Sequence, residues 1–214
     1  ELRDVFLKWS KICFSLVLLV GLYLVVLGPD FLGAWMGPQF VERSGPVLQV
    51  LMLSFFAYLP VRGVALPPLM GLGKPRFPAL ALLAMGVINL ALSLALVGKL
   101  GILGVALGTA IPNVLFAAAV LVHAARELEV GVGRWLLYTV AKPLVGALVP
   151  LAFLVAIARW VPAPSFPVLL ASGAAMVAIF AVVWVLFVFR ADPYLDLRAM
   201  LARKLPALAG RSKA

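Results

Sequence analysis

The stretch FPALALLAMGVINLALSLALVG, residues 77–98, contains no charged residue. A helix needs about 20 predominantly apolar residues to cross the hydrocarbon core of a bilayer. The apolar residues here follow one another without the alternation that is typical of strands in membrane barrels. Because only helices and closed barrels satisfy the backbone in lipid, residues 77–98 are predicted to form a membrane-spanning helix.

Other uncharged runs of the same character occupy much of the remaining chain. The sequence is 65% hydrophobic and 12% charged, with a mean hydropathy of +1.16, whereas soluble domains contain about 25% charged residues. We therefore predict an all-α, polytopic membrane protein rather than a soluble domain. Its six spans are expected at residues 12–29, 47–67, 77–98, 101–125, 135–158 and 167–189.

The basic residues between the spans predict the orientation of the chain. Thirteen lysines and arginines fall on one predicted side of the membrane: before span one, after spans two and four, and in the tail. Three fall on the opposite side: Arg43, Lys99 and Arg159. Basic residues remain cytoplasmic, so both termini of this segment are expected in the cytoplasm. The net charge of +10 is then a topology signal, and nucleic acid is not an expected partner because no basic soluble domain is present.

The predicted organisation has four parts. A cytoplasmic amphipathic lead-in at 1–11 is followed by four helices at 12–130, two final spans at 131–189 and a basic amphipathic tail at 190–214. Trp135 and Tyr138 are expected in the headgroup layer at the start of span five. Asp192 is expected to cap a tail helix on the inner leaflet, with a disordered tail as the alternative. Because the chain begins with Glu1 rather than Met, we expect it to be part of a longer protein.

Two cations fall within the predicted spans, Arg62 and Lys142, and no carboxylate does. A charge inside the bilayer costs about 2.5–3.5 kcal/mol on insertion scales, which favours a functional role. In PVRGVALPPLMGLGKPR, residues 60–76, the prolines and Gly63 predict an unwound end of span two. Both cations are expected in the cytoplasmic half, as a vestibule for an anion such as phosphate. The alternative is that each side chain extends to the headgroups.

Two asparagines complete the candidate substrate-binding residues, Asn89 in span three and Asn113 in span four. Their alternative role is hydrogen bonding between helices. Gly104 and Gly108 have the GxxxG spacing that lets helix backbones approach closely, and they predict a packing surface. One histidine and one cysteine without membrane carboxylates make no nucleophile–base pair or metal site, so neither an enzyme nor a bound cofactor is expected.

Several segments between residues 1 and 130 resemble a known family. FLGAWMGPQF at 31–40, GLGKPR at 71–76, INLALSL at 88–94 and LGILGVALGTAI at 100–111 are similar, in order and spacing, to the C-terminal half of polysaccharide-export flippases. These belong to the multidrug/oligosaccharidyl-lipid/polysaccharide superfamily. The resemblance implies a MATE-like fold of about fourteen helices in the bacterial cytoplasmic membrane, of which this chain forms one lobe. It also implies alternating access that moves lipid-linked, pyrophosphate-bearing oligosaccharides, with membrane lipids and a missing N-terminal lobe as partners.

Two other functions are compatible with the same sequence. A cation-coupled multidrug exporter of the same superfamily predicts a carboxylate in the missing lobe and efflux of a cationic dye. A membrane scaffold that does not transport predicts that Arg62 and Lys142 face lipid. Basic residues without membrane carboxylates favour an anionic substrate, and hence the flippase.

Overall fold

The computed structural model describes residues 2–190 and 192–195, and these residues form helices joined by short turns. The elements are α1 (Leu2–Val26), α2 (Gly28–Met36), α3 (Gln39–Gly71), α4 (Arg76–Leu100), α5 (Ile102–Glu127), α6 (Val132–Leu136), η1 (Leu137–Ala141), α7 (Lys142–Trp160), α8 (Phe166–Val183) and η2 (Trp184–Val188). The elements η1 and η2 are π-helical turns, so that α6, η1 and α7 form one long helix, and α8 and η2 another.

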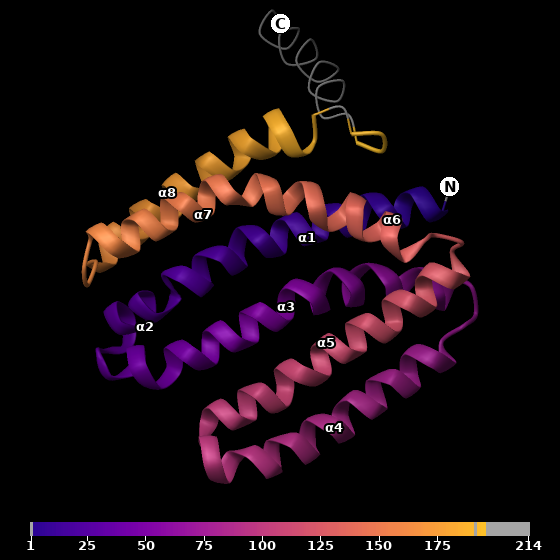
Figure 1. Cartoon of the computed structure of the whole chain (residues 1–214), viewed down its shortest axis with the longest axis horizontal. Helices are drawn as coiled ribbons and strands as arrows, with labels where there is room; N and C mark the ends of the chain where they lie inside the picture. The colour runs from indigo at the N-terminus through magenta and orange to yellow at the C-terminus, as the bar shows by residue number, and fades with distance from the viewer. Residues whose placement is uncertain (1, 191, 196–214) are drawn as a thin grey trace, which may run out of the picture.

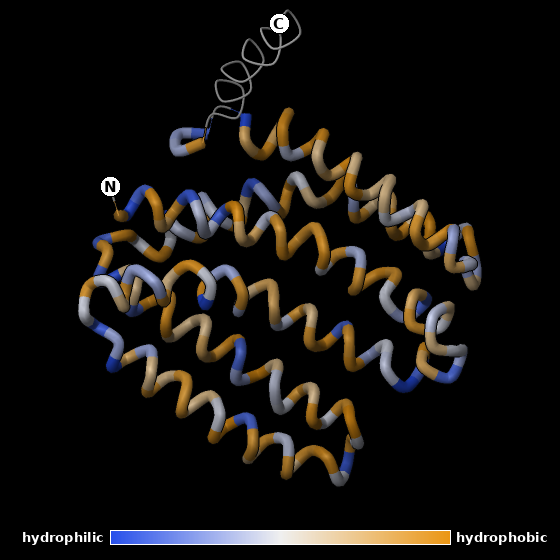
Figure 2. The backbone as a smooth tube through the Cα atoms, turned by 180° about the vertical axis from the view of Figure 1, so that it is seen from behind, coloured by the Kyte–Doolittle hydropathy of each residue, from blue (hydrophilic) through white to orange (hydrophobic). Residues whose placement is uncertain are grey.

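Within the described residues, six helical segments are long and apolar enough to cross a bilayer, and each of the six predicted spans overlaps one of them. Figure 2 shows the apolar colour along these helices and the hydrophilic colour mainly at their ends and connections. The predicted all-α class is therefore confirmed for the described residues. The lead-in at residues 1–11 and the first span are not separate elements, since α1 is continuous from Leu2 to Val26.

The long helices lie side by side in the order α4, α5, α3, α1, α7 and α8 (Figure 1). Each of α5, α3 and α1 packs between two neighbours, whereas α4 lies at an edge and buries only Pro78 of its own residues. The short helix α2 packs on α3 and touches α8. The helix α1 therefore joins two parts: a four-helix part (α1, α3, α4, α5) and a final helix pair (residues 132–188).

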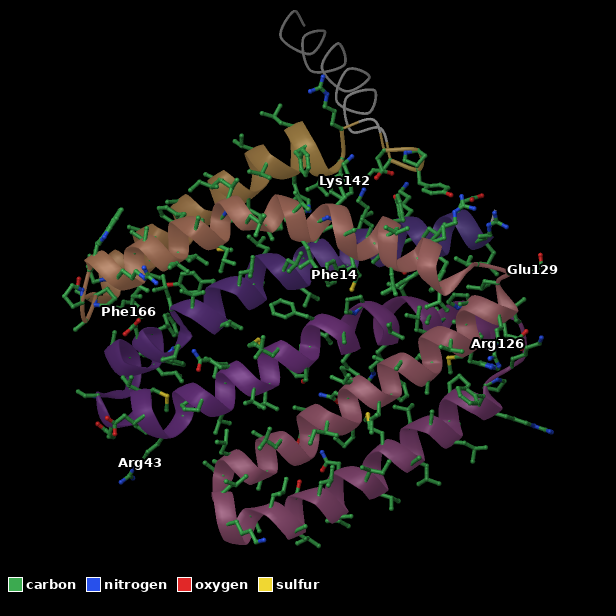
Figure 3. The ribbon with its side chains drawn as sticks, in the orientation of Figure 1. Phe14, Arg43, Arg126, Glu129, Lys142 and Phe166 are labelled. Atoms are coloured by element: carbon green, nitrogen blue, oxygen red, sulfur yellow. The ribbon has the colours of Figure 1, made fainter. Side chains whose placement is uncertain are left out.

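Successive connections alternate between the two ends of this row (Figure 1). The N-terminus and the α3–α4 and α5–α6 connections share one end, where Figure 3 labels Arg126 and Glu129. Arg43 and Phe166 lie at the opposite end. We refer to the first as the inner end, because the distribution of basic residues predicts that it faces the cytoplasm.

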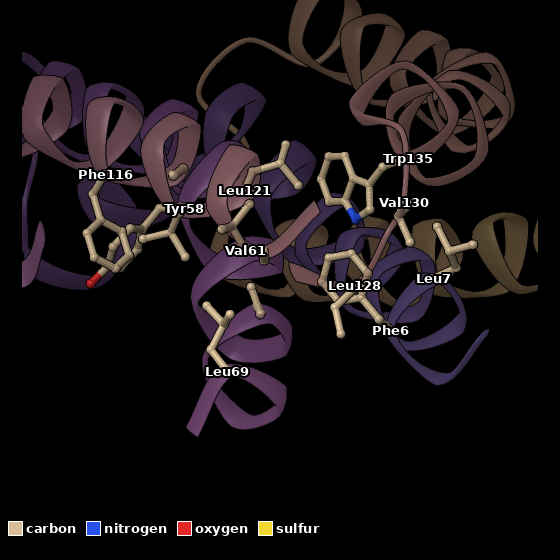
Figure 4. Close-up of a cluster of buried hydrophobic side chains, with 14 residues drawn as sticks. Phe6, Leu7, Tyr58, Val61, Leu69, Phe116, Leu121, Leu128, Val130 and Trp135 are labelled. Atoms are coloured by element: carbon tan, nitrogen blue, oxygen red, sulfur yellow. The ribbon is translucent and has the colours of Figure 1, made fainter. Parts of the chain in front are cut away.

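Two clusters of buried apolar side chains hold the row together. The inner core cluster joins α1, α3, α5 and α6, and includes Phe6, Tyr58, Leu121 and Trp135 (Figure 4). The second cluster joins α1 to α7 and α8. Trp135 is only 4% exposed, because its indole packs in the inner core cluster and donates a hydrogen bond to Ser10 Oγ at 3.0 Å. Its place in the headgroup layer stays a prediction.

The glycines of the GxxxG pair bring α5 against the backbone of α4, which confirms the predicted packing surface. A Cβ added at Gly108 would lie 2.7 Å from the Ser93 nitrogen, and one at Gly104 would lie 2.5 Å from the Leu96 oxygen. Helices in lipid gain little from apolar burial and associate through such close van der Waals packing. A side chain at either position would force the two helices apart.

The helix α3 continues without interruption through Pro46, Pro60, Pro67 and Pro68. The predicted unwinding around Gly63 is therefore wrong. Proline removes one backbone hydrogen bond and clashes with the preceding turn, but neighbouring helices and local adjustments often compensate within membrane helices. Pro60 is buried against the rest of the row, and Arg62 consequently projects from regular helix rather than from irregular backbone.

Candidate functional site

Arg62 projects from the inner half of α3 and is exposed. Its guanidinium donates a hydrogen bond to the hydroxyl of Tyr58, one turn earlier on the same helix. The guanidinium carbon lies 5.4 Å from the centre of the Tyr58 ring, a distance at which the ring attracts a cation. No carboxylate among residues 2–190 and 192–195 forms an ion pair with Arg62, so its charge remains available to a ligand.

The surface around Arg62 is an apolar groove between α1 and α3. Two adjoining cavities of about 670 and 540 Å³ form this α1–α3 groove, and they share Gly63 and Pro67. Apolar side chains such as Leu16, Leu66 and Met70 line the same cavity as Arg62. Arg62 is the charged residue among those that line the two cavities. The groove therefore combines a hydrophobic wall with a single cation.

Lys142 lies elsewhere, where η1 continues into α7 (Figure 3). Its ammonium donates a hydrogen bond to the carbonyl of Arg190 at 3.1 Å and lies 5.9 Å from the Phe187 ring. Lys142 thus satisfies a backbone carbonyl just beyond η2, and in the described part of the chain it has no partner in common with Arg62. The structure places the two predicted cations on different helices, each with its own surroundings.

The two asparagines link helices of the four-helix part. Asn113 on α5 is buried and donates to Ser54 Oγ on α3 at 3.2 Å. Asn89 on α4 donates to Thr109 Oγ1 on α5 at 2.9 Å. Both contacts are the interhelical hydrogen bonds that were the alternative to substrate binding, so the geometry favours packing over a ligand at these positions.

A second polar cluster, which the sequence did not reveal, lies at the inner end between α1 and the final helix pair. Lys11 on α1 forms an ion pair with Asp192, beyond η2, and the side chains are only 2% and 0% exposed. The ammonium also donates to the Val188 carbonyl at 3.1 Å. Tyr138 in η1 donates to Asp192 Oδ1 at 2.7 Å. We call Lys11, Tyr138 and Asp192 the inner polar cluster.

Asp192 also holds the chain segment that follows it. Its Oδ1 accepts hydrogen bonds from the backbone N–H groups of Tyr194 and Leu195, at 3.0 and 3.2 Å, as a helix N-cap does. The predicted tail helix lies outside the described residues. Burial by itself raises the pKa of the Asp192 carboxyl, but Lys11, the Tyr138 hydroxyl and the Tyr194 amide outweigh burial and hold this pKa below its usual range. The carboxylate is therefore ionised at neutral pH.

An apolar cavity of about 440 Å³ lies between the four-helix part and the final helix pair. Phe14 and Leu18 of α1 and Val61 of α3 form its floor, α5 contributes one wall with residues such as Ala118, and α6, η1 and α7 contribute the other. Phe14 lies three residues beyond Lys11, and Figure 3 shows it between the final helix pair and α3. We call this space the lateral cavity; its walls suit a hydrocarbon chain.

A comparison with models of protein families, with curated proteins and with solved structures found no match to this chain. The site is therefore interpreted from its own residues.

Proposed function

We propose that this chain is the C-terminal half of a flippase that moves lipid-linked, pyrophosphate-bearing oligosaccharides across the bacterial cytoplasmic membrane. Its partners in this proposal are the substrate, the surrounding lipids and the N-terminal lobe of the same protein. Transport proceeds by alternating access between the two lobes. Six helices of the described residues that are long and apolar enough to span a membrane and the sequence resemblance support the proposal, and Arg62 carries it.

Arg62 supports an anionic amphiphile because it is a permanent cation on an apolar groove and no carboxylate of the described residues neutralises it. A guanidinium presents several donors in a planar fork and binds phosphate oxygens in pairs. A cationic drug would instead be repelled by this side chain. The lateral cavity adds an apolar space of about 440 Å³ that suits the carrier lipid. Lys142 has a smaller part in this proposal, because its ammonium is bonded to the Arg190 carbonyl.

The test is flipping of a lipid-linked oligosaccharide by the intact protein in proteoliposomes, with Arg62→Gln beside the wild type. A hydrogen bond to a charged group contributes about 1.5–3 kcal/mol, so we expect a roughly 10- to 100-fold loss of apparent affinity. Arg43→Gln is the matched control, because Arg43 is an exposed arginine on the same helix at the opposite end.

The outcomes separate the candidate functions. Loss with Arg62→Gln and retention with Arg43→Gln would support the glycan flippase and the role of Arg62. Unchanged flipping would overturn the role of Arg62 and indicate that the side chain only reaches the headgroups. If the folded wild type flips no glycan but exports a cationic dye, the flippase proposal is wrong.

A further inference from the structure

The final helix pair is attached to the rest of the protein mainly through one helix. The segments α7, η1 and α8 pack on α1, with smaller contacts of α8 on α2 and of α6 on α5 at the two ends. The helices α3, α4 and α5 pack extensively on one another and on α1. Because Trp135 of α6 is held in the inner core cluster, the part of the final helix pair that can tilt about α1 is the part beyond α6.

The inner polar cluster lies at this junction. Lys11 belongs to α1, Tyr138 to the first helix of the pair, and Asp192 to the segment that leaves the second. Taking two charges out of water costs several kcal/mol per ion, and well-packed apolar side chains often stabilise such a position equally well. A buried ion pair is therefore a weak source of stability. This one joins α1 to the segment that follows the second helix of the final pair.

Each helix of the final pair contains a π-helical turn at the level of this cluster. Tyr138 belongs to η1, and Val188, whose carbonyl accepts from Lys11, belongs to η2. Thr139 Oγ1 in η1 and Trp184 Nε1 in η2 are buried and have no hydrogen-bond partner within the described residues. A π-helical turn interrupts the regular ladder of hydrogen bonds and is a common place for a helix to bend. The two turns are therefore suited to act as hinges.

The lateral cavity is lined by residues close in sequence to the cluster, such as Phe14 and Val140. One of its walls comes from α5, in the four-helix part, and the other from Trp135, Leu136, Val140 and Leu144 of the final helix pair. Val140 lies in the same π-helical turn as Tyr138. A tilt of the final helix pair at η1 would therefore change the width of the cavity.

We propose that the ion pair between Lys11 and Asp192 is a latch that holds the final helix pair close to α1 and keeps the lateral cavity narrow. When Lys11 and Asp192 separate, the final helix pair bends at η1 and η2, and the lateral cavity opens towards the lipid. The latch does not depend on the substrate of the protein, so its test is independent of the flipping assay.

The test measures distances between spin labels in the intact protein, reconstituted without substrate on a Cys13→Ser background. One label pair replaces Leu115 on α5 and Leu148 on α7, which are 53% and 59% exposed. The control pair replaces Leu115 and Leu53, because Leu53 lies on α3 within the four-helix part and is 56% exposed. The variants are Lys11→Met, Asp192→Asn and the exchanged pair Lys11→Asp with Asp192→Lys. Lys8→Met removes a neighbouring cation of α1 as the matched control.

In Lys11→Met and in Asp192→Asn, we expect the narrow α5–α7 distance distribution to be replaced by one with an additional component at longer distance. The α5–α3 distances should stay unchanged. The exchanged pair should restore the narrow distribution, and Lys8→Met should keep it. An unchanged α5–α7 distribution in the single variants overturns the latch. Broadening of both the α5–α7 and the α5–α3 distance distributions also overturns the latch, because the ion pair would then stabilise the whole fold. Failure of the exchanged pair to restore the distribution, or opening in Lys8→Met, shows that this pairing is not what holds the helices.

Discussion

The four-helix part and the final helix pair are both apolar, but different interactions attach them to α1 and to their neighbours. In the four-helix part, glycines bring α5 to the backbone of α4, and the neutral side chains of Asn113 and Ser54 join α5 to α3. The final helix pair also packs on α1 through apolar side chains, but at its inner end it adds a buried ion pair beside two π-helical turns. Close packing of one backbone on another favours a single arrangement, whereas an ion pair next to π-helical turns is the place where the proposed latch would allow a second.

A similar contrast separates the two cations of the inner half. Lys11 is 1% exposed and its charge is neutralised by Asp192. Arg62 is exposed, and in the described residues its hydrogen-bond partner is a neutral tyrosine. Burial and the partner, rather than the presence of a charge near a span, decide which cation is structural and which is available to a ligand.

The largest effect on stability is expected when the ion pair loses one charge. Asp192→Asn leaves the Lys11 ammonium buried without a counter-ion, which costs about 3–5 kcal/mol. The free energy of unfolding in mixed micelles with sodium dodecyl sulfate measures this loss. Asp30→Asn is the control: Asp30 is on α2, and burial raises the pKa of its carboxyl, so loss of that charge should cost little. Equal losses in the two variants would contradict the structural difference between these carboxylates.

The next largest effect is expected at the contact between α4 and α5. Gly108→Ala places a Cβ within 2.7 Å of the Ser93 nitrogen and 2.9 Å of its Cα, and such overpacking costs about 1–3 kcal/mol. Gly86→Ala is the matched control, because Gly86 is on α4 and has open space around its Cα. There the better helix propensity of alanine should stabilise the protein by up to about 1 kcal/mol. The same assay compares the free energies of unfolding of the two variants. An unchanged free energy of unfolding in Gly108→Ala would mean that α4 is loosely packed on α5.

The smallest effect is expected for the hydrogen bond between α5 and α3. Asn113→Ala removes the donor to Ser54 Oγ, but the serine hydroxyl keeps its own bond to the Leu51 carbonyl at 2.8 Å. Hydrogen bonds between membrane helices average about 0.6 kcal/mol in double-mutant cycles. A cycle with Ser54→Ala should give a coupling of this size. A coupling above about 2 kcal/mol would show that the four-helix part also depends on buried polar pairing.

The parts of the fold that were correctly predicted are those that short segments encode. Each span is a continuous apolar run of sufficient length, and a helix in lipid satisfies its own backbone whatever lies beside it. The GxxxG pair, Gly104 and Gly108, was recognised for the same reason: its spacing places two small residues on one face of one helix. The unbroken α3 shows the limit of this reasoning, because prolines that break an isolated helix are tolerated where neighbouring helices pack around them.

The candidate site was predicted only in part. Arg62 is recognisable as a cation inside an apolar segment, but Lys11 lies at the start of α1 among other basic residues and resembles a topology signal. Its partner Asp192 is 181 residues away in the sequence. No local pattern connects them, and only the passage of α8 beside α1 brings them together.

The amino-acid sequence was therefore sufficient for the six apolar helices, for the packing face of α5 and for a cation in the inner half of α3, because these follow from hydrophobicity and residue spacing along single helices. The order of the helices in the row, the burial of Trp135 and Lys11, and the pairing of Lys11 with Asp192 depend on which helix faces meet. Those faces are apolar almost all round in this protein, so hydrophobic pattern does not distinguish them, and only close packing and polar partners in three dimensions select one arrangement.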